Sequence, residues 1–174
     1  MFMCRSGPGS CALMAASIAA VRVLVVSVGR LRAPYADDVQ HYQRLLARYV
    51  RLELVEVRDE ARRPLRGPEH PGSQAPAPPD HLRRRLPPRA FVSLLDRGGE
   101  TFDSLSFSRF IEERRRSGRD LCFVVGGPHG LDLDGVDHRF SLGALTLPHQ
   151  LARVVVLEQV YRAHKILARE PYHY

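Results

Sequence analysis

The stretch LCFVVGGPHGLDLDGVDHRFSLGALTLPHQLARVVVLEQVY, residues 121–161, decides the fold of this chain. It opens with an apolar run, Leu121 to Val125, that ends abruptly in a glycine turn at residues 126–130. A second apolar run, Phe140 to Leu147, precedes a segment from His149 to Ala168 whose apolar residues recur at helical spacing. Strand, glycine loop, strand, loop and helix in this order are typical of the ligand-binding edge of an open α/β sheet.

The segments before this stretch repeat the alternation of strand and helix. Val21 to Val28 is nearly continuous in β-branched and other apolar residues, which predicts a strand buried on both faces. Tyr35 to Tyr49 carries apolar residues at three- and four-residue intervals, which predicts an amphipathic helix, and residues 52–57 predict the next strand. Together these patterns predict an α/β fold with a largely parallel open sheet flanked by helices.

A third strand and a second helix lead into the quoted stretch. Ala90 to Leu95 predicts the strand, and Asp96 to Gly99 after it predicts another glycine turn. Asp103 or Ser104 can cap a helix that runs through Arg116, where Gly118 would end it.

Two segments fall outside this alternation. Residues 58–88 are rich in proline, which predicts a solvated loop with one short turn at residues 80–86. Residues 1–20 are small and weakly apolar, and we expect them to form a disordered N-terminal extension. Residues 21–174 would then form the single domain. Deleting residues 1–20 should accordingly leave the melting temperature and the solubility unchanged.

The composition bounds the size and the partners of this domain. With 174 residues, 44% of them hydrophobic, the chain is long enough for one core and too short for two domains to be expected. Its formal charge of +7, from 26 basic and 19 acidic residues, favours a polyanionic partner such as RNA. Lys165 is the only lysine, and a bias in the coding sequence explains the arginine excess equally well. The positive balance remains either way.

The cysteines and the apolar runs argue against several classes of protein. Cys4, Cys11 and Cys122 show no paired spacing and are odd in number, which argues against a disulfide framework and against a zinc site. Cys122 lies in a predicted strand and is interpreted as a small core residue. No apolar run is long enough to span a bilayer, so we expect a cytoplasmic protein that needs neither a membrane nor a metal.

The paired glycines at positions 126 and 127 are compatible with a small-molecule site but do not specify one. Glycine lets the backbone approach a ligand closely, yet most strand-to-glycine turns are only tight turns. Neither phosphate-loop signature is present, because the spacing is not GxGxxG and no GK[ST] follows. A nucleotide phosphate is therefore a poor candidate for the ligand.

Three motifs carry a resemblance to a known family: GGPHG at 126–130, SLGALTLPHQLARVVVLEQVYRAHKI at 141–166, and Pro171-Tyr172-His173. In order and spacing they resemble the RlmH family, SPOUT-class methyltransferases that methylate N3 of a pseudouridine in 23S ribosomal RNA. The likeness runs from about Val21 to His173 and is weakest over residues 58–88. It implies a C-terminal trefoil knot, and ribosomal RNA of the large subunit or of the assembled ribosome as partner. It also implies a homodimer, which we expect to use the predicted C-terminal helix.

The resemblance also assigns roles to individual residues. Three loops at predicted strand ends, residues 95–99, 126–130 and 142–148, would meet at one edge of the sheet and hold S-adenosyl-L-methionine. The predicted cofactor contacts are Leu95, Gly126, Gly127, Leu142, Gly143, Ala144, Leu145, Thr146 and Leu147. The positions that match functional residues of the family are His149, Glu158, Arg162, Tyr172 and His173. Arg162 suits a phosphate or a developing anion, and Tyr172 or His173 suits contact with the target base.

Each of these assignments has a structural alternative. Leu142 to Leu147 can be a core strand, His149 can cap its helix, Glu158 and Arg162 can be a simple i, i+4 pair, and the tail can fray. Two arginine triplets, at 83–85 and 114–116, can be solvated surfaces or RNA contacts. For the whole chain, the alternative is a non-catalytic RNA-binding or ribosome-assembly protein with the same fold. A methyltransferase acting on another RNA is a third reading.

Overall fold

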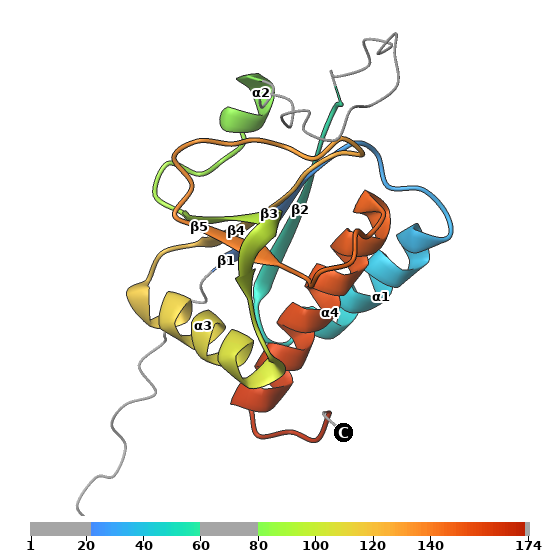
Figure 1. The fold of residues 1–174 in the computed structure, drawn as a ribbon. Coiled ribbons are helices and arrows are strands. Elements are labelled where there is room, and N and C mark those ends of the chain that lie inside the picture. Colours follow the sequence, from blue (N-terminus) through green and yellow to red (C-terminus); the bar gives the residue numbers. More distant parts are fainter. Residues whose placement is uncertain (1–21, 60–79, 173–174) are drawn as a thin grey trace, which may run out of the picture.

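A five-stranded sheet forms the centre of the computed structural model, which describes residues 22–59 and 80–172 (Figure 1). The strand order is β2-β1-β4-β3-β5, and every pairing between these strands is parallel. The strands are β1 (Arg22–Val28), β2 (Arg51–Val57), β3 (Phe91–Thr101), β4 (Leu121–Val125) and β5 (His138–Ser141). The predicted α/β fold with a parallel sheet is therefore confirmed.

Helices cover the two faces of the sheet unequally. Three long helices, α1 (Tyr35–Leu46), α3 (Ser104–Ser117) and α4 (His149–Leu167), lie on one face, with α4 contacting both of the others. The short helix α2 (Asp80–Arg83) and the loop around Leu131 and Leu133 cover the other face. Figure 1 shows α2 above the sheet and the three long helices below it.

Burial on both faces explains why β4 is apolar at every position and β1 at all but Arg22 and Ser27. In β1, Val23 and Val25 belong to the core beneath the long helices, while Leu24 and Val26 belong to the core beneath α2. Successive side chains of a strand point to opposite faces, so a strand covered on both sides needs an unbroken apolar run. Cys122 of β4 is fully buried, which confirms its place in the core.

The ends of the helices follow local signals in part. Asp103 caps α3 by accepting a hydrogen bond from the Ser106 N–H at 2.6 Å, and Gly118 ends the helix with φ of +69°. Both signals were predicted and are confirmed. The helix predicted over Tyr35 to Tyr49 ends earlier, at Leu46, because the chain turns there to bury Val50.

The glycine turn predicted at Asp96 to Gly99 is wrong. Strand β3 continues through it to Thr101, with a shift of register such that Leu95 and Glu100 both lie opposite Phe140 of β5. A Cβ atom on Gly99 would lie 2.6 Å from the Phe140 backbone. Glycine is therefore needed here for a close approach of β5 at a bulge in β3 and not for a turn.

The second apolar run, predicted as a strand over Phe140 to Leu147, is mostly loop. Strand β5 ends at Ser141, and residues 142–147 leave the sheet. Gly143 has φ of +123°, a conformation that breaks strand geometry and that residues with a side chain rarely adopt. The alternative of a core strand over Leu142 to Leu147 is therefore wrong.

Several expectations lie outside the described residues or are not tested by strand order. The N-terminal extension, residues 1–20, and most of the proline-rich loop, residues 60–79, lie outside the described part, whereas the predicted short turn is present as α2. The trefoil knot stays a prediction. No described helix is both long enough and apolar enough to cross a membrane. Among the described residues, no group of three or more His, Cys, Asp or Glu side chains is placed to hold a metal ion.

Candidate functional site

The bulged part of β3 and the loops that follow β4 and β5 line a cavity of about 440 Å³. This volume falls within the range of about 300–1,000 Å³ that is typical of small-molecule sites. The lining residues are Leu95, Asp96 and Arg97 of β3, His129, Gly130 and Leu131 of the loop after β4, Ser141, Leu142, Gly143, Leu145, Thr146 and Leu147 at the end of β5 and in the loop after it, and Ala152 of α4. The three predicted segments do converge, but the first is strand and not loop.

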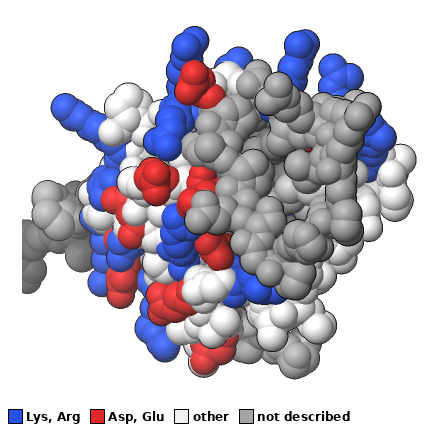
Figure 2. Space-filling model, turned by 45° about the horizontal axis from the view of Figure 1, so that its top comes forward, with Lys and Arg blue, Asp and Glu red and all other residues white. Residues whose placement is uncertain are grey.

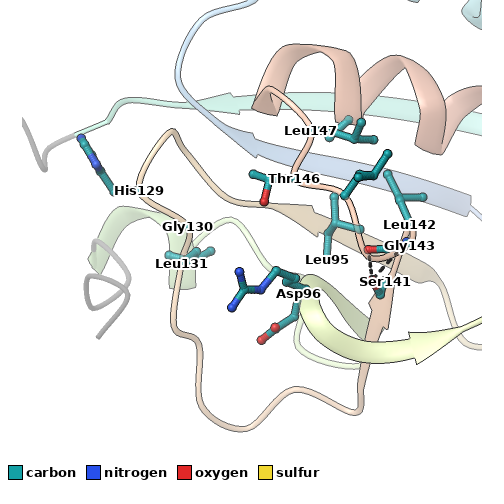
Figure 3. Close-up of a pocket in the computed structure, with 13 residues that line it drawn as sticks. Leu95, Asp96, His129, Gly130, Leu131, Ser141, Leu142, Gly143, Thr146 and Leu147 are labelled. Atoms are coloured by element: carbon teal, nitrogen blue, oxygen red, sulfur yellow. Dashed lines mark hydrogen bonds between the residues drawn. The ribbon is translucent and has the colours of Figure 1, made fainter. Parts of the chain in front are cut away.

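Leucine side chains form the apolar wall of the cavity. Figure 3 shows Leu95, Leu142 and Leu147 around one space, with Thr146 beside them and His129 apart at the opposite side. Ser141 fixes the start of the third loop, because its hydroxyl donates to the Gly143 carbonyl at 3.0 Å and accepts from the Gly143 N–H at 3.1 Å. The loop that carries three of the wall residues is thus held by a hydrogen-bonded turn.

Not every predicted cofactor contact faces the cavity. Of the nine residues predicted, Leu95, Leu142, Gly143, Leu145, Thr146 and Leu147 line it. Gly126 and Gly127, which begin the second loop, and Ala144, which is exposed on the third, do not line it.

The two glycines that begin the second loop nevertheless set its shape. A Cβ atom on Gly126 would lie 2.9 Å from the Gly130 carbonyl carbon and 3.0 Å from the Leu131 Cβ. The Gly130 N–H donates to the Gly127 carbonyl at 3.1 Å and closes the turn. This tight turn brings His129, Gly130 and Leu131 to the cavity.

An ion-pair network at the rim of the cavity had not been predicted. The Asp96 carboxylate accepts from the Gly98 N–H and from Arg139 of β5, both at 2.8 Å, and these contacts lower the pKa of Asp96. Arg139 also contacts Asp132 and the Leu133 carbonyl of the loop between β4 and β5. The position of Asp96 directly after a predicted strand was a usable signal, since polar residues at that edge often face a ligand.

A second cluster lies farther along α4 and contains three of the predicted functional residues. Glu158 accepts from Arg162 at 2.7 Å, and the Tyr172 hydroxyl lies 3.4 Å from the same Glu158 oxygen. The Arg162 guanidinium stands 5.0 Å above the centre of the Tyr172 ring, and Tyr161 makes an edge contact with that ring. The tail is therefore docked as far as Tyr172, against the alternative of fraying, while His173 lies outside the described residues.

Burial fixes the protonation of Tyr172. Desolvation, followed by the neighbouring Tyr42 and Glu158, raises the pKa of Tyr172 to about 12. The phenol is therefore neutral at working pH and acts as a hydrogen-bond donor and not as a base.

His149 lies at the other end of α4, nine residues before Glu158, which is about 13 Å along a helix. It begins the helix, but no side chain caps that end, so the capping alternative is wrong. Its Nε2 lies 3.7 Å from where a Cβ atom of Gly29 would be. Burial, and then the charge of Arg153, lower the pKa of His149, while Asp59 opposes the shift.

Arg153 was missed by the sequence patterns and ties α4 to the sheet. Its side chain is buried, with 3% of the residue exposed, and its Nη2 donates to the carbonyls of Val28 and Gly29 at 2.6 and 2.8 Å. These carbonyls end β1, so the contact fixes His149 and the cavity-lining Ala152 relative to the carboxyl edge of the sheet.

Comparison with known proteins agrees with this geometry. The family model described as "Predicted SPOUT methyltransferase" matches residues 21–173. The chain is 40% identical over 157 residues to the Ribosomal RNA large subunit methyltransferase H of Gemmatimonas aurantiaca, which covers 88% of this chain and 99% of that relative. It is 43% identical over 159 residues to the protein of the same name from Rubrobacter xylanophilus, over 88% of this chain and 98% of the relative.

Proposed function

The chain belongs to the SPOUT methyltransferase family, and we propose that it uses S-adenosyl-L-methionine to methylate N3 of a pseudouridine in 23S ribosomal RNA. Family membership implies a methyl donor, and the relatives are named for methylation of large-subunit ribosomal RNA. The observation that carries the choice of donor is the cavity at the carboxyl edge, which six of the nine residues assigned to the cofactor line.

The residues of the cavity fit S-adenosyl-L-methionine. Leu95, Leu142 and Leu147 offer apolar surface for the adenine, and the backbone of the third loop offers hydrogen-bonding groups for its edge. Asp96, kept ionised by its contacts with Gly98 and Arg139, lies at the rim and offers carboxylate oxygens as hydrogen-bond acceptors. When bound, the cofactor supplies a methyl group attached to a positively charged sulfur.

Side chains of α4 and of the C-terminal tail are proposed to accept the proton, hold the phosphate or the anion, and contact the target base. The target nitrogen must lose a proton before it can take a methyl group, and His149, whose pKa burial and Arg153 lower, is the proposed proton acceptor. Arg162, oriented by Glu158, is proposed to hold a phosphate or the developing anion, and Tyr172, with His173, to contact the target base. Most of the acceleration should come from positioning.

We further propose that the enzyme is a cytoplasmic homodimer. The cluster around Arg162 lies ten residues beyond Ala152 of the cavity, about 15 Å along α4, so one copy does not place both next to one nucleotide. In a dimer, one subunit can hold the cofactor while the tail and basic surface of the other hold the RNA. Leu151, Val154 and Val155 of α4 are only half-buried in one chain, which supports α4 as the contact.

Calorimetric titration with S-adenosyl-L-methionine tests this proposal. Leu145 is 83% exposed and lines the cavity, so Leu145→Arg should leave folding intact but place a cation at the mouth, where it repels the sulfonium. We expect at least about tenfold weaker binding, which corresponds to about 1.4 kcal/mol. Leu105→Arg is the matched control, since Leu105 is 54% exposed on α3 and away from the cavity, and it should bind as the parent does.

Methyl transfer is then measured on ribosomes that lack the modification. Incorporation of methyl at the pseudouridine, lost in Leu145→Arg and kept in Leu105→Arg, would support the proposal. A folded parent that does not bind the cofactor would sink it and favour a non-catalytic RNA-binding protein.

A further inference from the structure

The two arginine triplets of the chain differ in what surrounds them. In α3, Arg115 and Arg116 pair with Glu112 at 2.7 and 3.0 Å. Arg114 pairs with Glu113 at 2.9 Å and stacks 4.4 Å from the centre of the Phe91 ring. Two carboxylates thus offset two of the three positive charges of this triplet, and each of its arginines has an acidic partner.

The triplet Arg83, Arg84 and Arg85 has no such partners in the described part of the chain. All three residues are exposed, and no carboxylate among residues 22–59 and 80–172 pairs with them. Helix α2 ends at Arg83, the first residue of the triplet, and the preceding residue, Leu82, is fully buried against the sheet. A fixed backbone thus presents three free guanidinium groups to solvent.

Helix α2 adjoins the carboxyl edge of the sheet, where the cavity lies. The His81 ring nitrogen is 3.0 Å from the carbonyl of Arg58, which directly follows β2. Three more exposed arginines sit at this edge without an ion pair among the described residues: Arg30 and Arg32 after β1, and Arg97 on the cavity itself.

Two acidic residues at the same edge are engaged by other groups. Glu56 accepts from the Leu31 N–H at 2.8 Å and lies 3.6 Å from Arg153. Asp96 accepts from the Gly98 N–H and pairs with Arg139. Neither forms an ion pair with these exposed arginines among the described residues.

At the opposite edge, two arginines are paired, whereas Arg51 and Arg89 are exposed and form no ion pair among the described residues. Arg22 contacts both Asp120 and Glu53, and Arg119 contacts Asp137. Figure 2 shows basic and acidic side chains interspersed over much of the visible face and basic ones protruding along its upper margin.

We propose that Arg30, Arg32, Arg58, Arg83, Arg84, Arg85 and Arg97 form one phosphate-binding surface, the arginine surface, which holds the backbone of the RNA while its target nucleotide enters the cavity. This inference rests on the proposed function. An unpaired guanidinium binds phosphate through two parallel hydrogen bonds without first breaking an ion pair. Arg58, three strands away from β3, lies about 14 Å from it, a distance that several nucleotides can bridge. The RNA would therefore run along the carboxyl edge toward α2.

The test compares two triple variants that remove the same charge. Arg83→Gln/Arg84→Gln/Arg85→Gln removes the free triplet, and Arg109→Gln/Arg115→Gln/Arg116→Gln removes three exposed arginines of α3. Binding of a fluorescent single-stranded oligoribonucleotide, and of large ribosomal subunits, is measured from 50 to 200 mM salt. Calorimetry with S-adenosyl-L-methionine checks that both variants keep a folded cofactor site.

Loss of three phosphate contacts should reduce the slope of log affinity against log salt by about 2–3. Over this salt range the affinity of the parent should then fall about 20- to 40-fold more than that of the α2 variant. Cofactor affinity should not change, and the α3 variant should follow the parent.

Three results would overturn the proposal: an unchanged slope in the α2 variant, an equal loss in the α3 variant, or a loss on ribosomal subunits but not on RNA alone. The last would indicate contact with an acidic protein. The proposed function fails separately, if the parent binds RNA with the expected slope but transfers no methyl group; the arginine surface would then stand.

Discussion

Glu158 and Glu112 are matched carboxylates that each neutralise arginine on their own helix. Their side chains are 17% and 18% exposed, and each pairs with an arginine four residues later. If Glu158 orients Arg162 for the reaction, Glu158→Gln should lower methyl transfer at least about tenfold while cofactor affinity stays constant. Glu112→Gln should leave transfer unchanged, and each variant should lose at most about 1 kcal/mol of unfolding free energy.

These outcomes are read from single-turnover rates together with urea unfolding of both variants. Equal rates in the two variants would mean that the Glu158–Arg162 pair is only a helix contact, as its i, i+4 spacing alone suggests.

His149 should set the acid limit of activity. Burial and Arg153 on α4 hold its pKa below the usual 6.5, and Asp59 after β2 opposes them only in part. The neutral ring, which is the form that accepts a proton, therefore persists down to below pH 6.5, and activity is lost as pH falls through the lowered pKa. Because the folded protein favours the neutral ring, the contribution of His149 to the free energy of unfolding is complete above pH 6.5. It is lost as the pH falls through the lowered pKa.

A profile of kcat/KM against pH, with nuclear magnetic resonance titration of the ring, measures this limit. An acid limb at or above pH 6.5 that coincides with titration of His149 would contradict the prediction. A limb that remains unchanged in His149→Gln would remove His149 from the reaction.

At the scale of residues, the sequence predicted what sits in continuous motifs. Six cavity residues, Leu95 and five of the run 142–147, were identified by family resemblance. The pair of Asp96 with Arg139, and the bonds of Arg153 to the end of β1, join positions 43 and more than 120 residues apart. No local pattern encodes such contacts, because they exist only once the neighbouring strands and α4 are in register.

The bulge in β3 gives a test at the scale of elements. Gly99→Ala would place a Cβ atom 2.6 Å from the backbone of β5 and should cost about 1–3 kcal/mol or more of unfolding free energy. Gly98→Ala is the control, because its Cβ atom would meet only Asp96 Oδ1 at 3.6 Å, and the change should stay within about 0.5 kcal/mol. Denaturant unfolding of the two variants measures the difference. Equal stability would show that β3 and β5 can move apart at Gly99 without loss of unfolding free energy.

The same bulge explains why a turn was predicted where a strand continues. Two adjacent glycines after an apolar run are a common turn signal. Here Gly99 allows the approach of β5, a strand some forty residues later in the sequence, as the register Leu95 to Phe140 shows. Strands β1 to β4 and the three long helices were predictable from periodicity, whereas β5 was misplaced and the bulge depended on knowing which strand lies beside β3.

For the whole molecule, the testable expectation is the dimer. Light scattering at micromolar concentration should give twice the chain mass of 19.6 kDa. Val155→Arg, on the half-buried face of α4, should shift the protein toward the monomer and reduce methyl transfer more than it weakens cofactor binding. A parent that is monomeric yet fully active would refute both the dimer and the sharing of the site between subunits.

The strand order has a consequence for how the chain is synthesised. Strands β1 and β3 leave the ribosome before β4, yet in the finished sheet β4 lies between them. If β1 and β3 paired with each other first, that pairing would have to break before β4 could insert between them. Such long-range parallel pairing is slow to form. The cavity, whose last wall residue among those described is Ala152, is complete only when nearly the whole chain has been translated.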